Sequence, residues 1–120
     1  MGGRNQDQGQ LGEDLAVAFL KKKGFKIIER NFRIRGGEID IIAIHEDTLI
    51  FIEVKTRSSH EFGSPLEAIG YWKLKALVKT AQFYKVNHPK LPDAMRIDAV
   101  SVMLDRDNKM TNIELVRNIS

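Results

Sequence analysis

The sequence predicts an α/β domain in which a central mixed β-sheet is flanked by helices, in the order αβββαββ. Two long segments carry apolar residues at helical spacing, and the remaining segments are short and rich in Ile, Val and Phe, as strands are. The chain has 120 residues, of which 42% are hydrophobic and 29% charged, which suits one domain with one core. We expect a mobile tail over residues 1–9 and a single domain over residues 10–120.

The first half of the chain is expected to form one helix and three strands. In LGEDLAVAFLKKKG, apolar residues recur at helical spacing, lysines occupy the last turn and Gly24 stands where helices commonly stop, which predicts a helix over about residues 9–23. Phe25–Ile34 follows as a strand. The segments Glu38–Ile44 and Leu49–Lys55, separated by HEDT, predict a β-hairpin.

The second half is expected to form one helix and two strands. The helix begins at SPLE, where Ser64 can cap the helix, Pro65 can take the first helical position and Glu67 can close a capping box. It runs to about Val86, with a break near Gly70 as the alternative to one continuous helix, and the two prolines of HPKLP end it. Two strands follow, over Arg96–Leu104 and, at an edge of the sheet, Asn112–Val116.

The composition excludes several classes of protein. The absence of cysteine excludes disulfides, thiolate metal sites and cysteine nucleophiles. The longest apolar stretches are too short to span a membrane and MGGRNQDQGQ lacks the apolar segment of a secretory signal, so we expect a cytoplasmic protein without a membrane partner. The net charge of +3 permits a polyanionic partner without requiring one.

The hairpin carries two acidic residues at strand positions where an aliphatic residue would pack better. If its loop is symmetric, Asp40 lies directly opposite Glu53, and Glu38 lies opposite Lys55. Directly opposed residues point to the same face, with Cβ atoms about 4.5–5.5 Å apart. Strict alternation then places the acids on the face of Ile42, Ile44, Leu49 and Phe51, with Ile39, Ile41, Ile50 and Ile52 opposite, which predicts strands covered on both sides and semi-buried carboxylates.

Two interpretations fit this arrangement. Facing carboxylates repel each other, and a divalent cation such as Mg²⁺ offsets the repulsion while keeping positions for water and phosphate. Lys55 would then orient water or neutralise charge on a phosphoryl oxygen, which predicts phosphodiester hydrolysis. In the alternative interpretation the acids lie at the solvated rim of the sheet, each paired with a lysine or arginine, and Glu38 pairs with Lys55.

Glu13 is a third candidate acid, on the predicted first helix. It shares a helical stripe with Ala16, Val17 and Leu20, where a carboxylate is out of place unless it faces a polar site. The alternative is a glutamate in the first turn that complements the helix dipole.

At these residues the sequence resembles a known superfamily. GEIDIIA followed by LIFIEVKTR resembles the PD-(D/E)XK, or restriction-endonuclease-like, nucleases, although Glu38-Ile39 stands where that motif has its proline. The runs GEDLAVAFLKKKGFKIIERNFRIRGGEIDIIA, EVKTRSSHEFGSP and RIDAV resemble the YraN-like family, which is similar to Holliday-junction resolvases, over residues 9–117. The resemblance implies a restriction-endonuclease-like fold, metal ligands at Asp40 and Glu53, a catalytic Lys55, and Glu13 completing the site, with Mg²⁺ or Mn²⁺ as cofactor.

Basic and aromatic residues suggest where DNA would bind. Arg33 and Arg35 precede the hairpin, Arg57 follows Lys55, and Lys73 lies on the second helix; the alternative is a scattered, solvated basic surface. Tyr71 and Trp72 can stack on bases, although their helical spacing from Ile69 and Ala76 favours a place in the core. For Asp98 we expect a salt bridge, and for His60, in the loop after Lys55, no catalytic or metal-binding role.

The sequence thus predicts a metal-dependent nuclease-like protein that hydrolyses DNA, with branched or distorted DNA as its expected form and a homodimer as a compatible assembly. The alternative is a nucleic-acid-binding module that keeps the fold with little or no cleavage. A third interpretation, a protein-binding domain unrelated to nucleic acid, would show no salt-dependent affinity for DNA.

Overall fold

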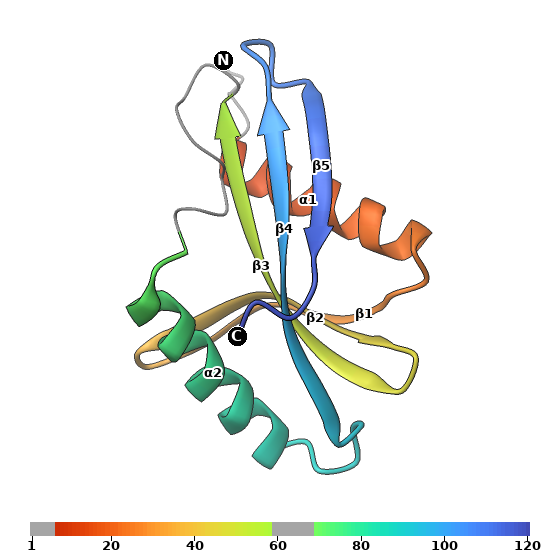
Figure 1. The fold of residues 1–120 in the computed structure, drawn as a ribbon, viewed down its shortest axis with the longest axis vertical. Coiled ribbons are helices and arrows are strands. Elements are labelled where there is room, and N and C mark those ends of the chain that lie inside the picture. Colours follow the sequence, from red (N-terminus) through yellow and green to blue (C-terminus); the bar gives the residue numbers. More distant parts are fainter. Residues whose placement is uncertain (1–6, 59–68) are drawn as a thin grey trace.

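The computed structural model describes residues 7–58 and 69–120, which form a five-stranded sheet in the order β1-β2-β3-β4-β5 and two helices (Figure 1). Neighbouring strands are antiparallel except β3 and β4, which are parallel and joined through α2. The predicted α/β class, the mixed sheet and the order αβββαββ are therefore confirmed. The elements are α1 (Gln8–Lys22), β1 (Lys26–Ile34), β2 (Gly37–His45), β3 (Thr48–Ser58), α2 (Tyr71–Val86), β4 (Ala94–Leu104) and β5 (Met110–Val116).

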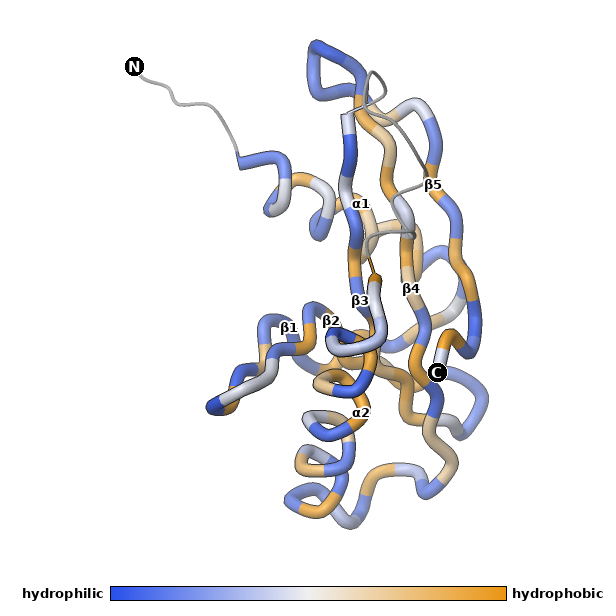
Figure 2. The backbone as a smooth tube through the Cα atoms, turned by 60° about the vertical axis from the view of Figure 1, so that its left-hand side comes forward, coloured by the Kyte–Doolittle hydropathy of each residue, from blue (hydrophilic) through white to orange (hydrophobic). Residues whose placement is uncertain are grey.

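Each helix covers its own hydrophobic cluster on the sheet. The first cluster packs Ala16 and Leu20 of α1 against strand residues that include Ile41, Ile50 and Ile52. The second packs Leu77, Ala81 and Tyr84 of α2 against strand residues that include Ile39, Ile42 and Phe51. Apolar segments of β2, β3 and β4 accordingly run between the helices (Figure 2). The prediction that the central strands are covered on both sides is confirmed, because β2 and β3 contribute to both clusters.

The hairpin has the symmetric register that the sequence predicted, but its ladder is shorter. β2 pairs with β3 from His45↔Thr48 to Ile41↔Ile52, where the ladder ends. The loop is a two-residue turn, in which Glu46 and Asp47 have φ angles of 49° and 64°. Positive φ at both central residues is the type I′ conformation that matches the twist of the flanking strands, so this turn forms without an Asn-Gly pair.

The alternation of β2 changes at Asp40, where the sequence prediction was wrong. Ile39 lies in the cluster under α2 together with Ile42, instead of on the face of Ile41. On the neighbouring strand β1, Asn31 has a φ of 55°, and β1 pairs with β2 on either side of the Asn31 and Asp40 positions without pairing there. A left-handed residue interrupts strand geometry, so the ladder on both sides of Asp40 is open.

The described part of α2 begins directly after Gly70, where the sequence allowed a break. The described helix begins at Tyr71, with Gly70 as an N-cap that has no side-chain hydrogen bond, and it ends at Val86 as predicted. The predicted capping box, Ser64 with Pro65 and Glu67, lies outside the described residues, as does His60. In the part of the chain that is described, neither helix is long and apolar enough to cross a membrane.

Gly12 allows α1 to pack closely on β3 beside the candidate site. A Cβ atom at Gly12 would lie 2.9 Å from the Cβ of Thr56 and closer still to its hydroxyl oxygen. Thr56 directly follows Lys55, so this contact sets the distance between α1 and the strand that carries two of the site residues. A glycine is required here because any side chain would push the helix away from the sheet.

We expect Gly12→Ala to lower the free energy of unfolding by about 1–3 kcal/mol, because the added methyl group overpacks the contact with Thr56. Gly9→Ala is the matched control in the same helix, since a Cβ there meets only Asp7 at 3.6 Å, an ordinary contact. Urea denaturation of the two variants provides the measurement. Equal stability of Gly12→Ala and Gly9→Ala would contradict the close packing.

Candidate active site

Asp40 lies where β2 and β3 separate. Its Oδ2 accepts a hydrogen bond of 2.8 Å from the backbone N–H of Val54, two residues beyond Ile52, where the pairing of β3 with β2 ends. The carboxylate therefore takes the place of a backbone acceptor and fills the opening between the two strands. This holds Asp40 beside Glu53, the residue that precedes Val54.

The two carboxyl groups influence each other strongly. Burial, and after it the charge of Glu53, raise the pKa of the Asp40 carboxyl to about 7; a hydrogen bond with Glu53 and the charge of Glu13 act in the same direction. The N–H of Val54 opposes this rise because it stabilises the ionised form. Glu53 itself is only 3% exposed. The prediction that Asp40 and Glu53 lie close together and partly buried is thus confirmed.

Two lysines lie beside Glu53. The Oε2 atom of Glu53 is 3.4 Å from Nζ of Lys73 and 3.7 Å from Nζ of Lys55. Lys55 comes from the same strand, two residues along, and Lys73 reaches the site from α2. The sequence marked Lys73 as a phosphate contact, but in the structure its ammonium group is paired with the buried carboxylate.

The rim interpretation of the acids does not describe the structure. Glu38 pairs with Arg33 at 3.1 Å and not with Lys55. Among residues 7–58 and 69–120, no lysine or arginine forms an ion pair with Asp40. Glu53 does pair with lysines, but it is buried. The repulsion between Asp40 and Glu53 is therefore only partly offset by the protein.

Glu13 faces the same site from α1. Its carboxylate is 7% exposed, lies outside the first turn, and accepts hydrogen bonds from Nε of Arg30 at 2.7 Å and Nδ2 of Asn31 at 3.1 Å. The helix-dipole interpretation is therefore wrong. Glu13, Asp40 and Lys55 line one cavity of about 500 Å³, and its other walls include Asn31, Arg33, Glu38 and Thr56.

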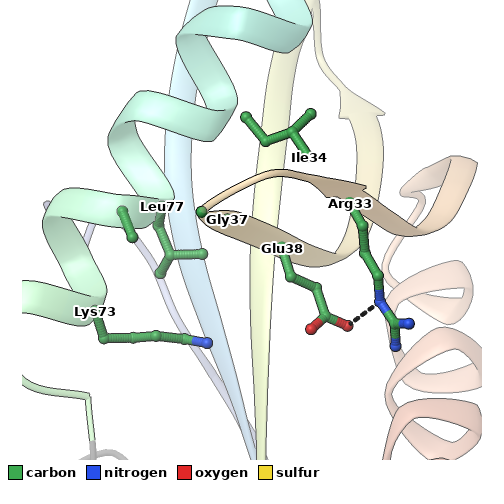
Figure 3. A pocket seen from close by; sticks show the side chains of 8 residues that line it. Arg33, Ile34, Gly37, Glu38, Lys73 and Leu77 are labelled. Atoms are coloured by element: carbon green, nitrogen blue, oxygen red, sulfur yellow. Dashed lines mark hydrogen bonds and ion pairs between the residues drawn. The ribbon is translucent and has the colours of Figure 1, made fainter.

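The predicted nucleic-acid contacts are only partly brought together. Arg33 lies in the wall of the site cavity and also of a second cavity of about 400 Å³, between the β1–β2 hairpin and α2. In Figure 3, Lys73 extends from α2 past Leu77, while Glu38 extends from β2 to its ion pair with Arg33. Arg35 is exposed at the hairpin turn, and Arg57 lies further along β3; neither lines these two cavities.

The structure also tests the predictions made for Tyr71, Trp72 and Asp98. The side chains of Tyr71 and Trp72 are 65% and 77% exposed, so the preference for a core position was wrong. Asp98 is fully buried and binds Arg96 through two hydrogen bonds of 2.8 and 3.0 Å, which confirms the expected salt bridge. Its Oδ1 also accepts the N–H of Asn118 at 2.9 Å, which ties the C-terminal segment to β4.

The sequence analysis missed Asn31, which orients Glu13 and interrupts β1. Its signal in the sequence is slight: asparagine adopts positive φ more readily than most residues, but a single asparagine in a strand segment does not announce a break. Arg30 was not predicted to belong to the site, yet it binds both Glu13 and Asp14.

The raised pKa of Asp40 predicts how stability depends on pH. The native state holds this proton more tightly than the unfolded chain, whose pKa is near 3.9, so stability falls as pH rises from about 4 to about 7. Asp40→Asn keeps an acceptor for Val54 but removes the charge. With EDTA present we expect it to stabilise the protein by roughly 1–3 kcal/mol at pH 8 and to have little effect at pH 4.

Chemical denaturation at both pH values provides this measurement, and exposed Asp107→Asn is the matched control, expected to change stability equally at both. If Asp40→Asn had the same effect at pH 4 and pH 8, the carboxyl group would not have the environment described above.

Comparisons with known proteins identify the family. Residues 12–102 match the Uncharacterised protein family UPF0102. A UPF0102 protein of Clostridium botulinum (strain Hall) is 44% identical over 117 residues, covering 95% of this chain and 94% of the relative. A UPF0102 protein of Dictyoglomus turgidum is 40% identical over 114 residues, covering 95% and 97%. The chain therefore belongs to the UPF0102 family, the YraN-like family that its sequence resembled.

Proposed function

We propose that this protein is a metal-dependent nuclease that hydrolyses phosphodiester bonds in DNA, including branched or otherwise structured DNA. The observation that carries the proposal is the Asp40–Glu53 pair: two carboxyl groups close enough that one raises the pKa of the other, held at the opening between two strands with Lys55 beside them. Asp40 lines a cavity, and a carboxyl group with a strongly raised pKa in a cavity is typical of functional sites.

The donor set fits Mg²⁺ with most of its coordination left to water and phosphate. Within the described parts of the chain, no three histidine, aspartate or glutamate side chains form a group that could hold a metal ion. Mg²⁺ needs no such group, since it is commonly held by one or two carboxylates together with substrate phosphate oxygens. Asp40 and Glu53 would hold it, and Mn²⁺ would substitute. When bound, the ion would polarise a phosphoryl oxygen and make a water molecule a better nucleophile.

The chain's own residues have separable roles in this proposal. The N–H of Val54 fixes the orientation of the Asp40 carboxylate. Lys55, with a side chain 29% exposed, can move from Glu53 to a phosphoryl oxygen, where its charge would stabilise the negative charge that develops during cleavage. Glu13 is paired with Arg30 at 2.7 Å and forms part of the wall of the cavity that Asp40 and Lys55 line.

A second candidate function is a DNA-binding module that does not cleave. It is favoured by the ion pairs of the site, because Glu13 is already bound by Arg30, and Glu53 by Lys73 and Lys55. Oppositely charged side chains that neutralise one another in this way can stabilise the fold without taking part in catalysis. The proximity of Glu53 to both Asp40 and Lys55 favours the enzyme.

Binding of a divalent ion separates the two functions. At an Mg²⁺ concentration 100 times its dissociation constant, a ligand specific for the native state stabilises it by about 2.7 kcal/mol. We expect Mg²⁺ or Mn²⁺ to raise the melting temperature of the wild type at pH 8 and to have little effect on Asp40→Asn. An equal rise in both proteins would place the ion elsewhere, and no rise in either would favour the DNA-binding module.

Cleavage is tested on single-stranded, duplex, flap and four-way DNA with Mn²⁺. We expect Glu53→Ala and Lys55→Ala to reduce the rate on the preferred substrate by at least about 100-fold, since one removes a ligand and the other the positive charge. Exposed Glu114→Ala and Lys90→Ala are the matched controls and should cleave as the wild type does. Equal activity in all variants would trace the cleavage to a contaminant or another site.

A further inference from the structure

An exposed aromatic pair marks the start of α2. The rings of Tyr71 and Trp72 meet edge to face with their centroids 5.0 Å apart, and both side chains are largely exposed. The other face of the same helix packs on the sheet through Leu77, Ala81 and Tyr84. Large aromatic side chains that remain in water beside a candidate site are more often binding surfaces than parts of the fold.

The chemistry of the pair suits an anionic ligand with flat aromatic parts. Nζ of Lys75 lies 5.4 Å from the centroid of the Tyr71 ring and 5.8 Å from that of the Trp72 ring. Lys75 is itself exposed, as is Lys79 one turn further along. Aromatic rings beside lysines are the surface on which single-stranded nucleic acids bind, with bases on the rings and phosphates on the ammonium groups. Binding of an apolar protein partner would not require the positive charges of Lys75 and Lys79.

The position of the pair connects it to the carboxylates. Lys73 is the next residue after Trp72, and its ammonium group lies 3.4 Å from Glu53. Lys73 belongs to the first turn of α2, so this ion pair connects the beginning of the helix to β3, the strand that carries Glu53 (Figure 1). If one phosphate of a DNA strand lay at Glu53, the neighbouring nucleotides of that DNA strand would therefore be within reach of Trp72.

We propose that Tyr71, Trp72 and Lys75, here called the α2 platform, bind an unpaired segment of the DNA substrate by stacking on a base. This inference rests on the proposed DNA-cleaving function and specifies its substrate. In an intact duplex the base faces are already stacked, so the α2 platform would select DNA whose bases are accessible, in single strands, flaps or junctions.

The sequence provides its own probe, because Trp72 is the single tryptophan of the chain. An oligo(dT) strand is titrated into the wild type in EDTA, which removes divalent ions and prevents cleavage. We expect the tryptophan emission to be quenched in parallel with the anisotropy of a labelled strand. Binding without any change in emission, or no binding of oligo(dT), would overturn the inference.

Variants test the role of stacking. Trp72→Ala should weaken oligo(dT) binding by about tenfold or more, and Trp72→Phe should restore most of the affinity because it keeps a ring for stacking. Phe83→Ala is the control: it removes another exposed aromatic of α2, about 16 Å further along the helix, and should leave binding unchanged. Equal loss in Trp72→Ala and Phe83→Ala, or no loss in either, would overturn the inference.

Charge is tested in the same way. The slope of the logarithm of the oligo(dT) binding constant against the logarithm of salt concentration reports the number of phosphate contacts. Lys75→Ala should reduce this slope by the equivalent of about one phosphate contact, whereas exposed Lys90→Ala should leave it unchanged. The same change in both variants would overturn the role of Lys75. A tryptophan spectrum that shifts to the blue with protein concentration alone would show that a second copy covers the ring, and would also overturn the inference.

The outcomes separate this inference from the nuclease proposal. If Trp72→Ala loses oligo(dT) binding but the wild type cleaves no DNA, the α2 platform stands as a binding site and the nuclease proposal fails. If Glu53→Ala abolishes cleavage while Trp72→Ala binds single strands as the wild type does, the nuclease proposal stands and the α2 platform fails.

Discussion

The repulsion between the carboxyl groups of Asp40 and Glu53 is the constraint on which the account of this protein depends. Burial of the Asp40 carboxyl, and after it the charge of Glu53, raise the pKa of Asp40 to about 7. A fold selected only for stability would gain by replacing either acid with an aliphatic residue, since both stand on strands that are otherwise apolar. The pair is understandable if the native protein binds a cation there.

The fold keeps this repulsion in place by holding the surrounding strands from both sides. α1 packs through Gly12 against Thr56, and α2 packs through Thr80 against Gly37, so each helix approaches a strand next to the site more closely than any side chain at the glycine would permit. Between the two helices, Asn31 interrupts β1 and the β2–β3 ladder ends at Ile41↔Ile52. The opening that Asp40 fills is therefore built into a rigid frame.

The architecture and the central acids were predictable because they follow from strong local patterns. The symmetric hairpin sets the register of β2 and β3, and this register places Asp40 next to Glu53. Glu13 lies on the apolar stripe of α1, so its side chain faces the site.

The change of alternation at Ile39 was not predictable, since it arises from the conformation of Asn31 on another strand. The exposure of Trp72 was missed because α2 has apolar residues on most of its faces, so the sequence does not decide which face is buried. The pairing of Lys73 with Glu53 depends on the placement of α2 against β3, which is a tertiary property.

The most direct test of the central claim is to follow the carboxyl carbon of Asp40 by ¹³C NMR as pH is varied, without divalent ions. We expect this carbon to titrate near pH 7 in the wild type and at distinctly lower pH in Glu53→Gln, where the neighbouring charge is gone. An ordinary pKa for Asp40 in the wild type, or a raised pKa that Glu53→Gln leaves unchanged, would contradict it.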